Sequence, residues 1–390
     1  MNKLTCFCSP RADGVSAEDL RRLFPEPSIT GPLLSLLQES KVDGFNLRSI
    51  IVLKDDLPVL LLPLFETRFD LSTFAEGPLR GLLKVAGRLI PSVFRPRVLS
   101  VGSVAGEWSE IGIDPNIDER TLDAAYRMAF SAMQTLASEL KSDIMGLYNF
   151  NDYGKLPGEV FNKFNRVQYR SCAMLPINFQ SIDEYLGRLS RAARKDMRRK
   201  MRVAPQVRVI RSRAVSPYLD RIYKLYLDTV TRGSMALGAH TRLFFEKVCE
   251  RVPDAEFMLY FVEDELVAFN LLIVQQEAMT DIFFCMDQGT GRKYNLYVLS
   301  WLENIRACLE RKILLYYTGQ GTEKTKAHLG ATFIPSFILF KHRWPVFDRL
   351  LFWQTAVTNK VLSYLGFWPD VPTSNAAVQK GELEIHDQRC

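Results

Sequence analysis

Apolar residues gather in long runs in both halves of the chain, and a pair of acidic residues interrupts each run. In the first half, the apolar arms of residues 49–67 flank Asp55 and Asp56. In the second half, the run from residue 255 is interrupted at Glu263 and Asp264, and a third apolar stretch ends at Asp287. Acidic turn residues between arms rich in Val, Ile and Leu predict β-hairpins. We therefore expect one hairpin in the first half and three successive strands in the second.

A helical period follows the first hairpin. Between residues 121 and 143, apolar side chains recur every three or four positions, which predicts an amphipathic helix, and residues 144–150 then predict a strand. The same criteria predict further helices over 33–40, 218–233, 241–252 and 296–312, and further strands over 313–319 and 336–344. Residues 1–30, with prolines at 10, 25 and 27, are predicted to be irregular.

Both halves thus repeat a hairpin, a helix and a following strand. This order predicts an α/β protein with mixed sheets of the α+β kind, and it argues against a doubly wound parallel sheet. The boundary is expected where Leu175-Pro176 closes the first half and Ser181 or Asp183 can cap the next helix. The predicted parts are an N-terminal domain over 1–178, a C-terminal domain over 179–345, and an amphipathic helix with a polar tail over 346–390.

Composition places the chain among ordinary globular proteins. Of its 390 residues, 47% are hydrophobic and 24% charged, so each half is long enough to bury a core of its own. The seven cysteines are scattered without the spacing of a zinc site, so no metal is expected and a reducing compartment is favoured. The N-terminus lacks the apolar stretch of a secretory signal, and no run of about 20 apolar residues predicts a membrane-spanning helix. We expect a cytoplasmic protein.

The net charge of +6 equals the charge of one segment, Arg191–Arg202, which holds seven Lys or Arg and one Asp. Leu186, Leu189, Ala193 and Met197 form an apolar stripe, which predicts one amphipathic helix starting near Asp183. The cationic side is either a solvated face or a site for phosphate, because Arg offers paired donors to that anion. Interleaved aromatic residues are missing, so general nucleic-acid binding ranks low.

Two longer segments resemble a known family. The stretch from Tyr185 to Arg202 and the stretch from Tyr294 to Arg343, with its Gly319-Gln320, Lys326 and Leu329-Gly330, resemble FemAB-like members of the GNAT acyltransferase superfamily. The resemblance covers roughly residues 120–350. It implies two GNAT-like (acyl-CoA N-acyltransferase) domains in tandem and transfer of an acyl or aminoacyl group to an amine. The repeated order of elements agrees with two such domains.

In a GNAT-like fold the donor lies between two splayed strands, which by position would be Thr280–Asp287 and Ile313–Gly319. Pyrophosphate would meet the loop and helix start after the first strand, with contacts from Gly289, Gly291, Arg292, Lys293 and Asn295. Asp287 is the candidate base, and Tyr297 or Tyr317 would return a proton to the leaving thiolate. Gln320, Glu323 and Lys326 follow a strand end, where site loops collect, and are candidates for substrate binding.

These residues predict direct transfer from acyl-CoA (acetyl-CoA or longer), or from a carrier-protein thioester, to a small-molecule or carrier-bound amine. An aminoacyl-tRNA donor is an alternative that ranks lower, because the long coiled coil common in that branch of the family is missing. A third alternative is a non-catalytic pair of domains that acts as a scaffold or lipid-surface binder. The apolar stripe over 346–368 would either pack on the domain or make peripheral contact with a membrane.

Overall fold

The computed structural model describes residues 3–10, 12, 15–69, 85, 87, 88, 94–106, 108–151, 164–232, 238–351 and 353. The chain forms one compact unit over Met1–Asp348, and a second unit starts at Arg349. Residues 345–351 are helical, and most of the predicted tail helix over 346–368 lies outside the described residues. None of the described helices is both long enough and apolar enough to cross a bilayer.

The first sheet contains the predicted hairpin. Its strands run in the order β1 (Leu4–Ser9), β2 (Phe45–Lys54), β3 (Leu57–Arg68), β4 (Arg97–Val101), β6 (Ile144–Asn151), β15 (Ser336–His342) and β7 (Asn165–Gln168), and β5 (Gly112–Ile113) pairs with β3. Asp55 and Asp56 join β2 to β3 with φ of 49° and 66°, the left-handed conformation that matches the twist of a tight hairpin. The predicted turn is confirmed.

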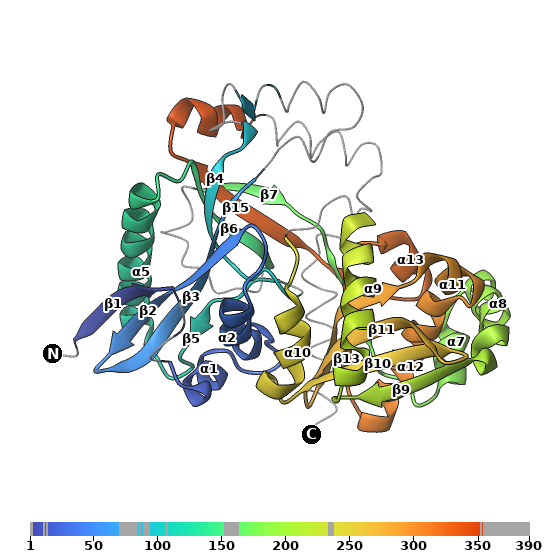
Figure 1. Cartoon of the computed structure of the whole chain (residues 1–390). Helices are drawn as coiled ribbons and strands as arrows, with labels where there is room; N and C mark the ends of the chain where they lie inside the picture. The colour runs from blue at the N-terminus through green and yellow to red at the C-terminus, as the bar shows by residue number, and fades with distance from the viewer. Residues whose placement is uncertain are drawn as a thin grey trace. The chain divides into compact units, whose positions relative to one another are not determined.

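Helices cover both faces of this sheet (Figure 1). The predicted amphipathic helix is α5 (Glu119–Glu139), whose Ala125, Ala129 and Met133 are fully buried against β2, β3 and β4. On the other face lie α1 (Ala17–Leu23) and α2 (Thr30–Ser40). The expectation that residues 1–30 are irregular is wrong. β1 pairs with β2 and extends the sheet. A reciprocal capping box between Ser16 and Asp19 starts α1 despite the nearby prolines.

The second sheet contains the three predicted strands. Its order is β14 (Thr332–Ile334), β8 (Cys172–Pro176), β13 (Leu315–Gln320), β12 (Ala278–Met286), β11 (Glu265–Val274), β10 (Ala255–Val262) and β9 (Val207–Ser212). One face packs against α7 (Ile182–Arg188), α8 (Arg191–Lys200) and α12 (Leu296–Arg311). The other face packs against α9 (Leu219–Arg232) and α10 (Arg242–Arg251).

The predicted basic helix is two helices. Ser190 has an extended ψ of 153° and accepts a hydrogen bond from the Ala193 N–H, so it ends the path of α7 and caps α8. The apolar stripe itself is confirmed, since Leu186, Leu189, Ala193 and Met197 are all buried.

The two sheets exchange strands. β8 precedes residue 178 but pairs with β13 and β14 in the second sheet, whereas β15 follows residue 179 but pairs with β6 and β7 in the first. Each predicted domain therefore contributes one strand to the other sheet. A domain boundary at residue 178 stays a prediction. The strand pairing shows that a cut at this residue would leave one strand of each sheet in the other half of the chain.

β12 and β13 part after a short parallel ladder. Their pairing covers only Ala278 with Leu315, Met279 with Tyr316 and Thr280 with Tyr317, after which β12 runs on to Met286 and β13 to Gln320. At the same level β12 is bulged: Asp281 pairs with Leu272 and Phe283 with Leu271, so Ile282 is the extra residue. The predicted opening between these two strands is confirmed.

A buried polar chain ties the helices of the second half together. Tyr185 Oη donates to the Leu329 carbonyl at 2.7 Å and accepts from Trp301 Nε1 at 2.8 Å. Tyr185→Phe would leave both partners unsatisfied in the core, so we expect the free energy of unfolding to fall by about 1–3 kcal/mol. Urea denaturation measures the change. The matched control is Tyr223→Phe, a half-buried tyrosine on α9; an equal loss in both variants would contradict the role of the Tyr185 hydroxyl.

Candidate active site

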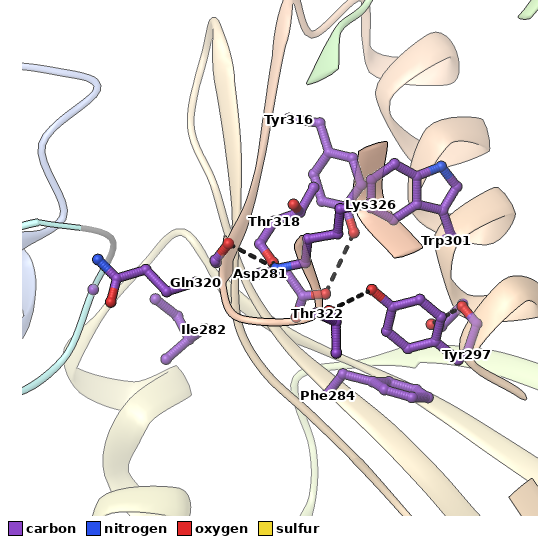
Figure 2. Close-up of a pocket in the computed structure, with 13 residues that line it drawn as sticks. Asp281, Ile282, Phe284, Tyr297, Trp301, Tyr316, Thr318, Gln320, Thr322 and Lys326 are labelled. Carbon is purple, nitrogen blue, oxygen red and sulfur yellow. Dashed lines mark hydrogen bonds between the residues drawn. The ribbon is translucent and has the colours of Figure 1, made fainter. Parts of the chain in front are cut away.

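A cavity of about 310 Å³ lies where β12 and β13 part. Figure 2 shows side chains from both strands and from the following helices gathered around this space. The lining residues that matter here are Asp281, Ile282 and Phe284 on β12, Tyr316, Thr318 and Gln320 on β13, Tyr297, Ser300 and Trp301 on α12, and Lys326 on α13 (Glu323–His328).

Asp281 is the acidic residue of this cavity. Its Oδ2 accepts hydrogen bonds from Asn270 Nδ2 at 2.8 Å, Asn304 Nδ2 at 3.3 Å and Tyr316 Oη at 3.3 Å. Its Oδ1 is buried and has no hydrogen-bond partner among the described residues. One oxygen is therefore fixed by three donors, while the other retains its full capacity to accept a proton or a hydrogen bond.

Burial raises the pKa of Asp281 from 3.8 to about 6, because the charged form loses hydration. The hydrogen bond from Asn270, the charge of Lys326 and the hydrogen bond from Tyr316 oppose this rise and keep the pKa below neutrality. At neutral pH the group is thus mostly an anion, yet it binds a proton far more readily than an exposed aspartate. This balance suits a general base.

Lys326 closes the end of β13. Its side chain is 4% exposed, and its Nζ donates to the carbonyl oxygens of Gly319, at 2.7 Å, and Thr318. The ammonium group thereby holds the strand end and places a positive charge in the cavity wall. Of the three residues predicted to bind substrate, Lys326 and Gln320 line the cavity, whereas Glu323 lies at the start of α13 outside its lining.

The two predicted proton donors lie on opposite sides of the sheet. Tyr297 lines the cavity with its Oη 3.2 Å from Thr322 Oγ1, and burial raises its pKa. Tyr317 is buried on the other face, where its ring packs edge-on against Trp108 at 5.2 Å. Because side chains alternate along a strand, the neighbouring Tyr316 is the one that faces the cavity.

Asp287, the predicted base, caps a helix outside the cavity. It is the N-cap of α11 (Gln288–Lys293), and its Oδ1 accepts from the Thr290 N–H at 2.8 Å. This hydrogen bond lowers the pKa of Asp287, which makes the group a weak base. The structure thus gives Asp287 a capping contact, and Asp281, six residues earlier on β12, is the aspartate that lines the cavity.

The predicted phosphate-binding loop is largely helical. Gly291 is buried in α11, where a Cβ would approach Met286 Sδ to 2.5 Å, and its N–H donates to the Asp287 carbonyl at 2.7 Å. Packing against Met286 therefore explains why residue 291 is a glycine. Gly289, Arg292 and Lys293 are exposed. None of these residues, nor Asn295, lines the cavity.

The start of α12 lies beside the cavity. Asn295 adopts a left-handed conformation with φ of 51° and gives α12 no side-chain cap, and its Nδ2 reaches the Lys200 carbonyl at 3.4 Å. The first N–H groups of a helix lack intrahelical acceptors, so an uncapped start favours an anion. Since Tyr297 lines the cavity two residues after Asn295, such an anion would lie at its edge.

Comparison with known proteins agrees with this geometry. Residues 191–327 match the family model described as an acetyltransferase (GNAT) domain. No curated protein matches the chain. Among solved structures, L-PGS from Bacillus licheniformis has a TM-score of 0.53 at 10% identity, covering 87% of this chain and 96% of that one. FemX has a TM-score of 0.51 at 11% identity, covering 86% and 96%.

A tandem GNAT protein from the clavulanic acid biosynthesis pathway, solved without AcCoA, has a TM-score of 0.50 at 10% identity, covering 88% of this chain and 99% of that one. At such low identity these likenesses show the fold alone. The fold is a tandem pair of GNAT-like domains, each built on one mixed sheet. The family model thus places a GNAT domain in the second half of the chain, and the solved structures show the tandem GNAT-like fold for both halves.

The raised pKa of Asp281 has a cost in stability. The folded protein binds this proton more tightly than the unfolded chain, so the free energy of unfolding falls as pH rises from about 4 to about 6, by up to about 3 kcal/mol. Asp281→Asn removes the charge and should be more stable than the wild type at about pH 8, with the difference shrinking near pH 4. Urea denaturation at both pH values measures it.

The matched variant Asp287→Asn has the opposite expected sign, because the pKa of Asp287 is lowered in the folded protein and its carboxylate stabilises the fold above that pKa. If Asp281→Asn were instead less stable than the wild type at about pH 8, the carboxylate would be held by compensating contacts and the raised pKa would be wrong.

Proposed function

We propose that the protein is an acyltransferase that moves an acyl group from a CoA or carrier-protein thioester to an amine. The observation that carries the proposal is the buried, half-unpartnered carboxylate of Asp281 at the point where β12 and β13 part. A transferase of this kind must hold an extended donor, deprotonate an amine and stabilise an oxyanion. The cavity offers groups for each task.

The donor fits the opening between the strands. Beyond Thr280 and Tyr317 the ladder ends, so backbone groups of β12 no longer pair with β13 and are available to the amides of a pantetheine arm, which would lie between the strands. On β13, Lys326 already binds the carbonyls of Thr318 and Gly319. CoA and acyl-carrier proteins share this arm. The diphosphate of CoA would then meet the uncapped start of α12, with the exposed Arg292 and Lys293 just before it.

In the proposed reaction Asp281 takes a proton from the incoming ammonium group, directly or through one water molecule. The free amine then attacks the thioester carbonyl, forming the C–N bond, and the negative charge passes to the carbonyl oxygen. The bulge leaves Ile282 as an extra residue in the ladder, so its backbone N–H is a candidate donor to that oxygen. Collapse breaks the C–S bond, and Tyr297, hydrogen-bonded with Thr322, supplies the proton to the thiolate. The attacking nitrogen gives up its second proton, which returns through water to Tyr297, and Asp281 releases the first proton to solvent.

A second candidate donor is an aminoacyl-tRNA. On α8 and just after it, Arg191, Lys195, Arg198 and Arg202 have no acidic partner among the described residues. The hydrogen bond from Asn295 to the Lys200 carbonyl places the end of α8 beside the start of α12. This cationic surface therefore adjoins the expected phosphate position, which favours either CoA phosphates or a nucleic-acid backbone. The chemistry at Asp281 would be the same, with an ester as the donor.

Donor identity can be tested by ligand-dependent thermal shift. Acetyl-CoA or a longer acyl-CoA should raise the melting temperature of the wild type by several degrees at saturation, because binding to the folded state stabilises it by mass action. Charged tRNA should produce no shift at moderate salt. If charged tRNA raised the melting temperature and no acyl-CoA did, the donor would be an aminoacyl ester of tRNA and not a thioester.

The role of Asp281 can be tested by activity. Once an amine is accepted, Asp281→Asn should lower kcat by about 10²–10⁴-fold while the donor still raises the melting temperature, because the base is lost but the pocket is kept. In the wild type, kcat/KM should rise with pH through a pKa of about 6, since only the ionised carboxylate accepts a proton. Asp287→Asn is the matched control and should retain most activity. Equal losses in the two variants would argue against Asp281 as the base.

A further inference from the structure

A second cavity, of about 390 Å³, lies on the other face of β12. It is lined by Tyr226 and Thr229 from α9, by Tyr148 from β6, and by Tyr169 and Arg170 from the segment between β7 and β8. It therefore lies between the helix that covers the second sheet and residues of the first half. A cavity of this size suits a small molecule.

The two cavities meet at the bulge of β12. Ile282, Phe284 and Gln320 line both of them. Figure 2 shows Ile282 and Gln320 on the other side of the strands from Tyr297 and Trp301. A molecule in the second cavity can thus present one end at the bulge. The proposed thioester carbonyl and Asp281 lie at the same bulge, on the side of the first cavity. Such an arrangement separates a donor from an acceptor.

Charge distinguishes the second cavity from the first. Among the described residues that line it, Arg170 is the one with a formal charge, and none of them is a carboxylate. The half-buried guanidinium of Arg170 has no hydrogen bond or ion pair with a described residue. Its backbone is fixed, because the Arg170 carbonyl accepts from Gln320 Nε2 at 3.1 Å and Ser336 Oγ at 2.8 Å. A cation held in place without a counter-ion favours an anionic ligand.

Hydroxyl groups beside Arg170 add to this preference. Tyr148 Oη donates to Tyr169 Oη at 3.0 Å, which leaves the Tyr169 proton to be donated elsewhere. His240, 4% exposed, lies in the same lining, and its buried Nδ1 has no partner among the described residues. Burial lowers the pKa of His240 to about 4, so it is neutral and adds no second charge.

From this arrangement we infer that the second cavity binds the acceptor, and that the acceptor is an amino acid or a similar small amine with a carboxylate. The carboxylate pairs with Arg170 and Tyr169, and the amine points to the bulge at Ile282. One guanidinium balances one carboxylate, whereas a phosphate dianion would remain half-compensated. This assignment rests on the proposed acyl transfer for its direction, but the binding site itself does not.

Binding is tested first, without turnover. A panel of amino acids, each matched with its decarboxylated amine and its carboxamide, is added to the full-length protein, and binding is measured by thermal shift and calorimetry. At least one amino acid should bind, and its carboxamide and decarboxylated partner should bind at least about tenfold more weakly, as loss of a charge-assisted pair predicts. Phosphoethanolamine is the phosphate probe.

Arg170→Met should abolish the advantage of the carboxylate, and Arg170→Lys should restore part of it, since Lys keeps the charge but loses the paired donors. Arg251→Met is the matched control, because Arg251 is an exposed arginine on α10 that lines neither cavity and pairs with Glu39. In transfer assays with an acyl-CoA, Arg170→Met should raise KM for amino acids about 10–100-fold more than it raises KM for the decarboxylated amines.

The outcomes separate the two ideas. If amino acids bind in a manner that depends on Arg170 but no donor is used, the acceptor site stands and the proposed transfer fails. If amines without a carboxylate bind or react equally well, or Arg170→Met weakens both series alike, the acceptor assignment is overturned and the transfer stands. A preference for phosphoethanolamine would show that the site selects a phosphate and not a carboxylate. If no amino acid bound, the assignment of the second cavity as an acceptor site would be wrong.

Discussion

The parting of β12 from β13 is the constraint on which the candidate site depends. A sheet normally pairs every backbone group of its central strands, and ending a ladder after three pairs leaves polar groups that must find other partners. The protein supplies some of them itself. Lys326 binds the carbonyls of Thr318 and Gly319, and Gln320 reaches Asn149 and Arg170 across to the first half. The open end of β13 is thereby held away from β12.

The bulge complements this opening. With Ile282 as the extra residue, Asp281 faces α12 while Phe283 packs toward α9. In a regular strand residues 281 and 283 would share one face, and the bulge is what places them on opposite faces. The surrounding amides of Asn270 and Asn304 then hold Asp281 in one orientation. A buried carboxylate would otherwise be costly at this position.

Much of the secondary structure could be predicted from local sequence patterns. The hairpin at Asp55 and Asp56, α5 and the three strands β10 to β12 could all be predicted because turn chemistry and periodicity act over a few residues. Partners in a sheet are set by contacts distant in sequence, so the exchange of β8 and β15 had no local signal. The break at Ser190 did have one, a serine three residues before a buried alanine, but the continuous apolar stripe concealed it.

The site shows the same division. The pair of splayed strands, Tyr297, Gln320 and Lys326 could be placed from the resemblance and from their positions at strand and helix ends. The sequence did not indicate Tyr316, which lines the cavity, because both faces of this strand are buried, and apolar alternation then does not say which face holds a cavity. Asp281 was visible as an acid within an apolar run. Asp287 drew attention instead because strand ends usually carry functional residues, whereas here the strand end starts a helix.

The crossing of β15 into the first sheet also bears on how the chain is made. β15 lies between β6 and β7, so the space between those two strands stays empty until residues 336–342 have been synthesised. The first half therefore cannot complete its sheet as it leaves the ribosome, and it must wait until β15 has been synthesised. Assembly of the two halves is in this sense a single late event, in contrast to the usual succession of domains that fold one after another from the N-terminus.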